Sequence, residues 1–153
     1  MVDLREHLLS SLPERFDLVA MSMGGVLALS LALDYSERVR KLVLVATSGG
    51  VNVAALGGLD WRDTFRRLLP KAPTWFVEDH TNVTHRLGDL RAPTLLVFGE
   101  QDLIAPVAVG KFLRSMLPDA RLEVIPDVTH DLQEECPDLL ASLIEAHLRR
   151  AQP

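Results

Sequence analysis

The run Leu42-Val43-Leu44-Val45 is apolar at every position instead of at alternate positions. A strand of this kind is buried on both faces, which is typical of a parallel sheet covered by helices on each side. We predict four strands along the chain, over residues 16–20, 39–46, 94–99 and 121–125. Helices are predicted around them, over residues 2–12, 26–33, 106–117 and from 131 or 137 to 150. Strands that alternate with helices indicate an α/β fold built on one parallel sheet.

The long connection between the second and third predicted strands has a different character. It contains two glycine pairs, at 49–50 and 57–58, and both tryptophans of the chain. Because its helical patterns are short and interrupted by prolines, we predict a helical lid over about residues 48–90, inserted into a single domain that spans residues 1–153. The aromatic residues of the lid either line a pocket or form a small core of their own; they are Trp61, Phe65, Trp75 and Phe76.

The charge and cysteine content of the chain exclude several classes of protein. Its 153 residues include 16 Lys and Arg and 21 Asp and Glu, which gives a net charge of −5. Nucleic-acid binders usually carry a basic excess, so we expect no nucleic-acid partner. The single cysteine, Cys136, excludes an internal disulfide and a zinc cage of cysteines, and we expect it to be structural rather than reactive. Without an apolar run of about 18 residues or a signal-peptide core, we expect a cytoplasmic protein with no membrane partner.

Three residue types that act together in nucleophilic catalysis follow three of the predicted strands. Ser22 comes after the first strand, Asp102 after the third and His130 after the fourth. Ligands of open parallel sheets bind at the carboxyl ends of the strands, so we expect these side chains at one edge of the sheet. A serine hydroxyl is a weak nucleophile until a base takes its proton and an acid holds that base in the right tautomer. The sequence therefore predicts a serine nucleophile, a histidine base and an orienting aspartate.

The residues around Ser22 favour a sharp turn between a strand and a helix. Such a turn brings the residues two before and two after the nucleophile close together, and these positions hold Ala20 and Gly24. The helix that follows offers free backbone N–H groups and the positive end of its dipole. We expect the Met23 N–H to face the oxyanion that develops when Ser22 attacks a carbonyl.

On these motifs the sequence resembles the α/β-hydrolase family. Ala20-Met21-Ser22-Met23-Gly24-Gly25 is similar to the family's nucleophile elbow, with alanine in place of the more common first glycine. Val97-Phe98-Gly99-Glu100-Gln101-Asp102 resembles the segment that carries the family's acid, and Thr129-His130 resembles the segment that carries its base. The three motifs stand in the family's order and span nearly the whole chain.

The resemblance implies a partial α/β-hydrolase fold, with the lid in the place of the family's cap. It implies a serine hydrolase that cleaves a carboxylic ester or a related acyl bond of a small molecule, without a cofactor or a metal. The family's roles pass to Ser22 as nucleophile, Asp102 as orienting acid, His130 as base and the Met23 N–H as oxyanion donor. Because the same fold also supports cleavage of lactones, amides and carbon–carbon bonds, the substrate stays open.

The front of the sequence departs from the family's pattern. Family members carry further strands ahead of the nucleophile strand, and a His-Gly-type loop after one of them supplies a second oxyanion donor. This sequence begins at the helix that would precede the nucleophile strand, so half of the oxyanion hole has no obvious source. Strand 16–20 is then expected at an edge of the sheet, where an unpaired apolar strand tends to pair with another chain. We expect a second copy of the chain to cover this edge, in a symmetric dimer with a continuous sheet.

Two other hypotheses remain open for the chain as a whole. In the first, it is a truncated, catalytically impaired hydrolase fold that acts as a binding or interaction module. In the second, Met1 lies inside a longer natural protein that supplies the earlier strands.

Individual site residues also have simpler interpretations. Aspartate is common in turns such as Gly99-Glu100-Gln101-Asp102, so Asp102 has a simpler interpretation as a turn residue. Glu100 is a less favoured candidate for the acid. Asp127 and Asp131, on either side of His130, are interpreted as turn and cap residues. The histidines of the lid, His80 and His85, lie near acidic residues, but solvated lid positions are favoured over a metal site. The remaining two, His7 and His147, are predicted on the surface of helices.

Overall fold

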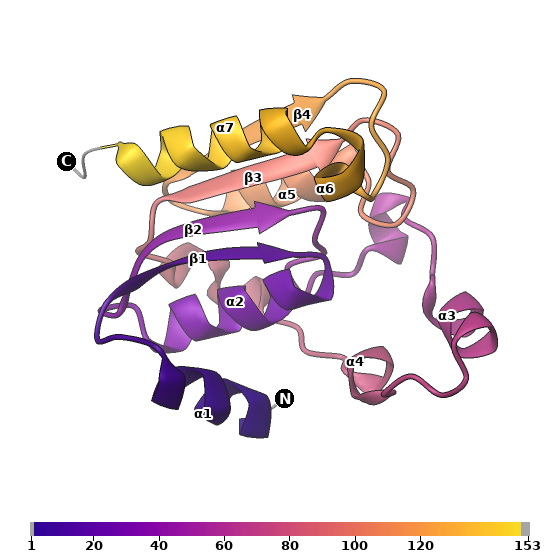
Figure 1. Ribbon diagram of the computed structural model, residues 1–153, viewed down its shortest axis with the longest axis horizontal. Coiled ribbons are helices and arrows are strands. Elements are labelled where there is room, and N and C mark those ends of the chain that lie inside the picture. The colour runs from indigo at the N-terminus through magenta and orange to yellow at the C-terminus, as the bar shows by residue number, and fades with distance from the viewer. Residues whose placement is uncertain (1, 151–153) are drawn as a thin grey trace.

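The computed structural model describes residues 2–150, apart from the side chains of Val2, Asp3 and Phe76. Its centre is a sheet of four parallel strands in the order β1-β2-β3-β4 (Figure 1). The strands are β1 (Phe16–Met21), β2 (Val39–Val45), β3 (Thr94–Gly99) and β4 (Ala120–Ile125). The predicted α/β architecture is confirmed, and each strand begins and ends within one residue of the prediction.

Helices cover both faces of the sheet. They are α1 (Val2–Ser11), α2 (Met23–Asp34), α3 (Arg62–Leu68), α4 (Trp75–Glu78), α5 (Val107–Met116), α6 (Leu132–Glu135) and α7 (Pro137–Arg149), with the short 3-10 helices η1 (Ala54–Leu56) and η2 (Thr84–Asp89). On one face α2 and α5 pack against the strands, and α7 runs along the other face (Figure 1). The predicted terminal helix is divided into α6 and α7, because Cys136 leaves the helical conformation at φ −144° and Pro137 starts the next helix, where it needs no N–H bond.

The apolar run in β2 divides its side chains between two cores. Leu42 and Leu44 enter the cluster beneath α2 and α5, while Val43 and Val45 enter the cluster beneath α7. Neighbouring residues of a strand point to opposite faces, so a strand with a core on each side is apolar throughout. The end of the lid joins the first core, where Val83, Leu87 and Leu90 are buried together with Ala92. That part of the insertion therefore anchors the lid to the sheet.

The end of α7 is held by a buried lysine. Lys41, on β2, donates from its Nζ to the carbonyls of His147 at 3.1 Å and Leu148 at 2.6 Å, and also to that of Arg150. A cation at the end of a helix binds carbonyls that lack partners inside the helix and interacts favourably with the helix dipole. This contact ties the last turn of α7 to the centre of the sheet.

The surface position predicted for His147 is wrong. The residue is only 5% exposed, and its Nε2 lies 3.2 Å from the Pro93 carbonyl, which identifies Nε2–H as the donor. Its Nδ1 is buried with no hydrogen-bond partner among the described residues. Leu140, one buried residue of α7, precedes His147 by two helical turns, so both point into the fold.

Acidification is expected to destabilise the fold through His147. Burial lowers the pKa of His147 below its usual value of 6.5, and the charges of Lys41, Arg121 and Arg150 lower this pKa further against the opposing bond to Pro93. The unfolded chain therefore takes up this proton first, and the stability that the neutral side chain contributes is full above about pH 6.5 and falls below it. Urea unfolding of the wild type and His147→Gln at pH 7.5 and 5.5 measures this. The wild type should lose more stability than the variant, and an equal loss would rule the mechanism out.

Strand β1 lies at the edge of the described sheet, as expected for strand 16–20. Its Val19 side chain is 47% exposed, on the face of the sheet that carries α7. Among residues 2–150, no helix has the length and apolar character needed to cross a bilayer.

Candidate active site

Ser22 occupies a tight turn between β1 and α2. Its backbone angles are φ 51° and ψ −124°, and Met23 is already the first residue of the helix. A positive φ at a residue other than glycine costs about 1–3 kcal/mol, and such strain is concentrated at functional sites. The turn is held on the strand side by the Ser22 N–H, which donates to the Val45 carbonyl at 2.9 Å. The Met23 N–H begins the helix and so lies outside its i→i−4 hydrogen bonds.

Thr47 holds the same turn from the loop that follows β2. The side chain is fully buried, and its Oγ1 donates to the Ser22 carbonyl at 2.5 Å. A Cβ added at Gly25 would lie 2.4 Å from that Oγ1, so only glycine leaves room for the contact. In contrast, a Cβ at Gly24 would meet Ala20 at an ordinary 3.9 Å. The strictest requirement for a small residue therefore lies at Gly25, and not at Gly24, the position that the elbow pattern singles out.

Replacing Gly25 with alanine is expected to destabilise the protein by about 2 kcal/mol or more, because Thr47 cannot move away within a packed interior. Gly24→Ala is the matched control. The site has room for a methyl group, and alanine is favoured over glycine in a helix by about 1 kcal/mol. Urea denaturation of both variants should show a large loss for the first and none for the second, and equal effects would contradict this account of the turn.

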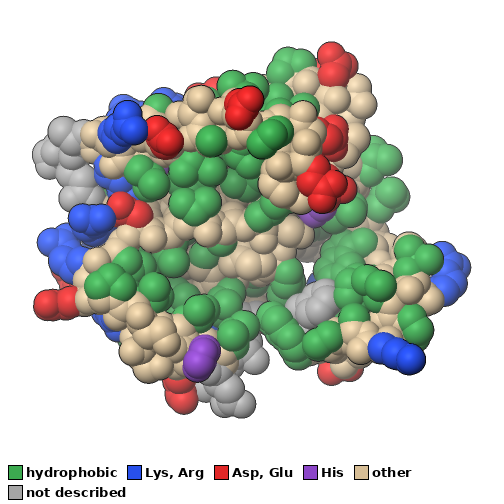
Figure 2. Space-filling view, viewed as in Figure 1, with side chains coloured by type: hydrophobic (Ala, Val, Ile, Leu, Met, Phe, Trp, Pro, Cys, Tyr) green, Lys and Arg blue, Asp and Glu red, His purple; other side chains and the backbone are tan. Residues whose placement is uncertain are grey.

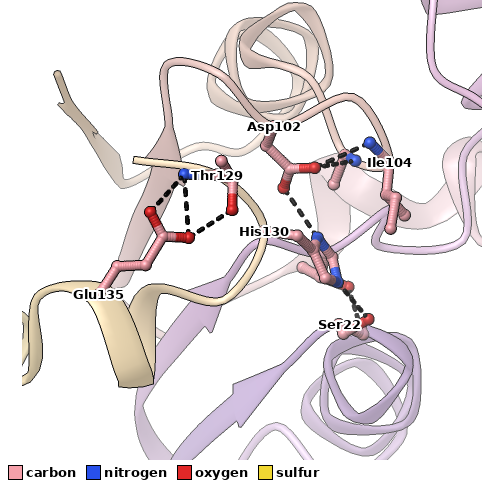
Figure 3. A network of polar contacts seen from close by, with 8 residues as sticks. Ser22, Asp102, Ile104, Thr129, His130 and Glu135 are labelled. Atoms are coloured by element: carbon pink, nitrogen blue, oxygen red, sulfur yellow. Dashed lines mark hydrogen bonds and ion pairs between the residues drawn. The ribbon is translucent and has the colours of Figure 1, made fainter. Parts of the chain in front are cut away.

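His130 connects the other two predicted side chains (Figure 3). Its Nε2 lies 3.0 Å from Ser22 Oγ, and its Nδ1 lies 2.8 Å from Asp102 Oδ2. Because a carboxylate only accepts hydrogen bonds, Nδ1 carries the proton and Nε2 is left as the acceptor for the Ser22 hydroxyl. The structure thus brings Ser22, Asp102 and His130 together in a chain of contacts that can move a proton from serine to histidine.

Asp102 is buried, and both oxygens of its carboxylate have hydrogen-bond partners. Its Oδ1 accepts the N–H groups of Ile104 at 2.8 Å and Ala105 at 2.9 Å, while Oδ2 faces His130 (Figure 3). The side chain has no exposed surface, so these three hydrogen bonds replace the water that a charged carboxylate needs. Oδ1 thus makes the contacts of a turn residue, the simpler interpretation of Asp102, while Oδ2 of the same carboxylate faces His130.

Gly99 lets the loop that carries His130 approach the loop that carries Asp102. A Cβ at Gly99 would lie 2.3 Å from the Thr129 carbonyl and 2.4 Å from the Val128 carbonyl. The Gln101 N–H also donates to the Val128 carbonyl at 2.9 Å. The two loops are therefore in direct backbone contact, which brings His130 within reach of the acid.

The other acidic residues near His130 have surroundings that differ from those of Asp102. Asp127, at φ 58°, accepts a hydrogen bond from the Gln101 side chain at 3.1 Å. The Asp127 N–H donates to Glu100 Oε2 at 3.4 Å. Asp131 stands at the start of α6 without a side-chain cap bond, although its carbonyl accepts the first bonds of the helix. Among the described residues, Asp102 is the one carboxylate that forms a hydrogen bond with the imidazole of His130.

A cavity of about 450 Å³ opens in front of the serine. Ser22, Met23 and His130 line it from the sheet, while Leu59 and Trp61 line it from the lid. In Figure 2 the lid forms a lobe at the right, with hydrophobic side chains on its surface and a hollow between it and the rest of the molecule. The cavity therefore lies at the carboxyl edge of the sheet, where ligands of open α/β sheets bind.

The aromatic residues of the lid lie in different surroundings, and the pocket role is supported for Trp61. Trp61 lines the cavity, and Phe65 packs against it edge-on at 5.8 Å between ring centroids. Trp75 is 43% exposed, and the side chain of Phe76 lies outside the described part of the chain. The lid thus presents one tryptophan to the cavity, with a second ring behind it.

The remaining candidate residues do not join the site chemistry. His80 lines the cavity and His85 is exposed. Among the side chains that the structure describes, no three His, Cys, Asp or Glu residues are grouped so that they could hold a metal ion. Cys136 donates to the Leu132 carbonyl at 3.3 Å, and burial, together with the nearby Glu135 carboxylate, raises the pKa of its thiol. A raised pKa favours the protonated thiol, which is the less reactive form.

Comparison with known proteins places this geometry in a family. A 2-hydroxymuconate semialdehyde hydrolase of Pseudomonas putida is 30% identical over 181 aligned positions, which cover 88% of this chain and 63% of that protein. A pimeloyl-[acyl-carrier protein] methyl ester esterase of Nitrosomonas europaea is 26% identical, over 94% of this chain and 75% of that protein. The chain thus spans less than two thirds of the length of the Pseudomonas putida relative.

Solved structures show the same fold. The α/β hydrolase MGS-M2, from a deep-sea metagenome library of the Medee basin, superimposes with a TM-score of 0.74 at 20% identity, over 99% of this chain and 72% of that one. The family model for the α/β hydrolase fold matches residues 3–86, which include the Ser22 turn and most of the lid. Since this match covers more than half of the 153 residues, the chain belongs to the α/β-hydrolase fold family.

Proposed function

We propose that the protein is a serine hydrolase that cleaves a carboxylic ester or a related acyl bond. The observation that carries the proposal is the continuous contact from Ser22 Oγ through His130 to the buried Asp102, at 3.0 and 2.8 Å. It opens on a cavity rather than into the core. The names of the relatives cover a semialdehyde hydrolase and a methyl ester esterase, so the family supports hydrolysis without fixing the bond that is cleaved.

In the proposed acylation step, Ser22 Oγ attacks the substrate carbonyl carbon while His130 Nε2 takes the hydroxyl proton. Asp102 holds the imidazolium that results, and the Met23 N–H donates to the oxyanion. His130 then passes the proton to the departing alcohol as its bond to the acyl carbon breaks. This leaves the acyl group on Ser22.

In the proposed deacylation step, water replaces the alcohol. His130 removes a proton from the water as its oxygen attacks the acyl carbon, and the second tetrahedral intermediate collapses when the proton reaches Ser22 Oγ. The acid is released and the free serine is restored. Each proton moves between Ser22, His130, the water and the leaving group, so this step needs no metal or cofactor.

The cavity supports an apolar acyl group. Its apolar lining comes from α2, the lid and the loop after β3, through Val26, Leu59 and Ile104. The Arg62 guanidinium, also in the lining, lies 5.4 Å from the centre of the Trp61 ring, and its Nε donates to the Val77 carbonyl at 3.2 Å. Both of these Arg62 contacts are with residues of the lid itself.

A series of p-nitrophenyl esters tests the proposal. We expect hydrolysis of the acetate, butyrate or octanoate, with an initial burst of about one p-nitrophenolate per protein chain as the acyl-enzyme accumulates. Hydrolysis without a covalent intermediate on Ser22 would contradict the mechanism. No hydrolysis of any ester or acyl substrate would favour the alternative of a binding module.

We also propose that a second copy of the chain covers the free edge of β1. The Phe16 N–H donates to the Arg38 carbonyl, just before β2, and the Ser22 N–H donates to the Val45 carbonyl at its end. The alternate residues Asp17, Val19 and Met21 therefore turn their backbone groups toward the open edge. Light scattering at micromolar concentration should give twice the chain mass of 17.0 kDa. Val19→Lys places a charge on this edge and should give the monomer. A wild-type protein of 17.0 kDa would contradict the proposal.

A further inference from the structure

Thr129, the residue directly before His130, is hydrogen-bonded to a side chain at the end of α6. Glu135, the last residue of α6, accepts the Thr129 N–H at 3.3 Å with Oε1 and at 3.2 Å with Oε2 (Figure 3). Its carboxylate also accepts the Thr129 hydroxyl. Hydrogen bonds to a charged acceptor are stronger than those between neutral groups. Both donors of Thr129 thus converge on one side chain.

These bonds close a ring that contains His130. The backbone from Asp131 to Glu135 is fixed by the turn of α6, in which the Asp131 carbonyl accepts the N–H groups of Glu134 at 2.9 Å and Glu135 at 3.0 Å. The Glu135 carboxylate then returns to Thr129, so the chain is tied on both sides of His130. Gly99 and Gln101 hold the other side of the loop. The backbone on both sides of His130 is therefore held by hydrogen bonds.

We propose that Glu135 is a positioning residue that sets the imidazole of His130 between Ser22 and Asp102 by holding Thr129. The proposal rests on the proposed hydrolase function. Glu135 touches neither Asp102 nor Ser22 in the network of Figure 3, so it acts through the backbone. Glu135 and Thr129 are both exposed, so we expect their contact to contribute little to the stability of the fold.

Kinetics of Glu135→Ala test the proposal. A small displacement of a catalytic group can cost up to about 10²-fold in rate, so we expect kcat to fall about tenfold with KM within about twofold. Glu134→Ala is the matched control, because it removes the same charged side chain from the same helix at a position with no bond to Thr129. An equal loss in both variants would overturn the proposal.

The conservative variant separates position from charge. Glu135→Gln removes the charge but keeps an amide oxygen that accepts one of the two Thr129 donors, so kcat should stay within about threefold of the wild type. A loss as large as that of Glu135→Ala would show that charge, and not position, matters. Thr129→Val combined with Glu135→Ala should lose no more activity than Glu135→Ala alone, because both changes break the same tie. Additive losses would overturn the proposal.

A spectroscopic measurement reads the geometry without substrate. The proton between His130 Nδ1 and Asp102 Oδ2 should give a downfield ¹H NMR resonance in the wild type. We expect this resonance to shift or broaden in Glu135→Ala and to be unchanged in Glu134→Ala. An unchanged resonance in Glu135→Ala overturns the positioning role even when the protein hydrolyses esters. If the resonance is lost in Glu135→Ala but the wild type hydrolyses no substrate, the positioning role stands and only the proposed hydrolase function is contradicted.

Discussion

Ser22→Ala is expected to lower kcat by about 10⁶-fold, since the remaining site keeps only binding and the backbone donor. Ser22 Oγ is the atom that His130 Nε2 faces at 3.0 Å, and alanine has no atom in that place. The variant should fold normally because a methyl group fits wherever the serine side chain fits. Initial rates with the best p-nitrophenyl ester of the series measure the effect.

Ser30→Ala provides the control for this prediction. Ser30 lies on the same helix, α2, and is 5% exposed, with an Oγ that has no hydrogen-bond partner among the described residues. Removing an unpartnered buried hydroxyl leaves no donor or acceptor unsatisfied, so stability and kcat should be unchanged. If Ser22→Ala retained more than about a hundredth of the wild-type kcat, Ser22 would not be the nucleophile.

Asp102→Asn is expected to lower kcat by about 10⁴-fold. The amide oxygen takes the place of Oδ1 and keeps the N–H groups of Ile104 and Ala105, so the NH₂ group faces His130. Because that NH₂ group donates to Nδ1, the imidazole carries its proton on Nε2. It then cannot accept the proton of Ser22.

The same chemical change at Asp127 is the control. Asp127 lies in the loop before His130 at φ 58°, a conformation that asparagine also adopts readily, and its carboxylate accepts only from the Gln101 side chain among the bonds described for it. We expect Asp127→Asn to keep kcat within about twofold. A loss of less than tenfold in Asp102→Asn would exclude Asp102 as the orienting acid.

The parts of the fold that follow from local patterns could be predicted. The apolar run at residues 42–45 indicates a doubly buried strand, and the structure has both cores. The small residues around Ser22 indicate a tight turn, and Ser22 has the positive φ of such a turn. Because each of these signals lies within a few neighbouring residues, the strand ends that carry Ser22, Asp102 and His130 could be located.

Features that depend on contacts between distant segments could not be predicted. Thr47 is part of a Thr-Ser-Gly-Gly sequence that indicates only a loop, yet its hydroxyl holds the Ser22 carbonyl. Gly99 is needed because the carbonyls of Val128 and Thr129 lie against it, and no pattern around Gly99 indicates that approach. For His147 a signal existed, because it follows the buried Leu140 by seven residues, but the polarity of histidine favours a surface position.

Labelling by a fluorophosphonate, followed by mass spectrometry of the digested protein, tests the central claim most directly. The probe reacts with a serine whose proton a neighbouring base can take, so it reports the contact between Ser22 and His130 without requiring the right substrate. We predict stoichiometric phosphonylation of Ser22 in the folded wild type, and none in Ser22→Ala or in protein unfolded by urea. Folded wild-type protein in which Ser22 stays unlabelled would contradict the account.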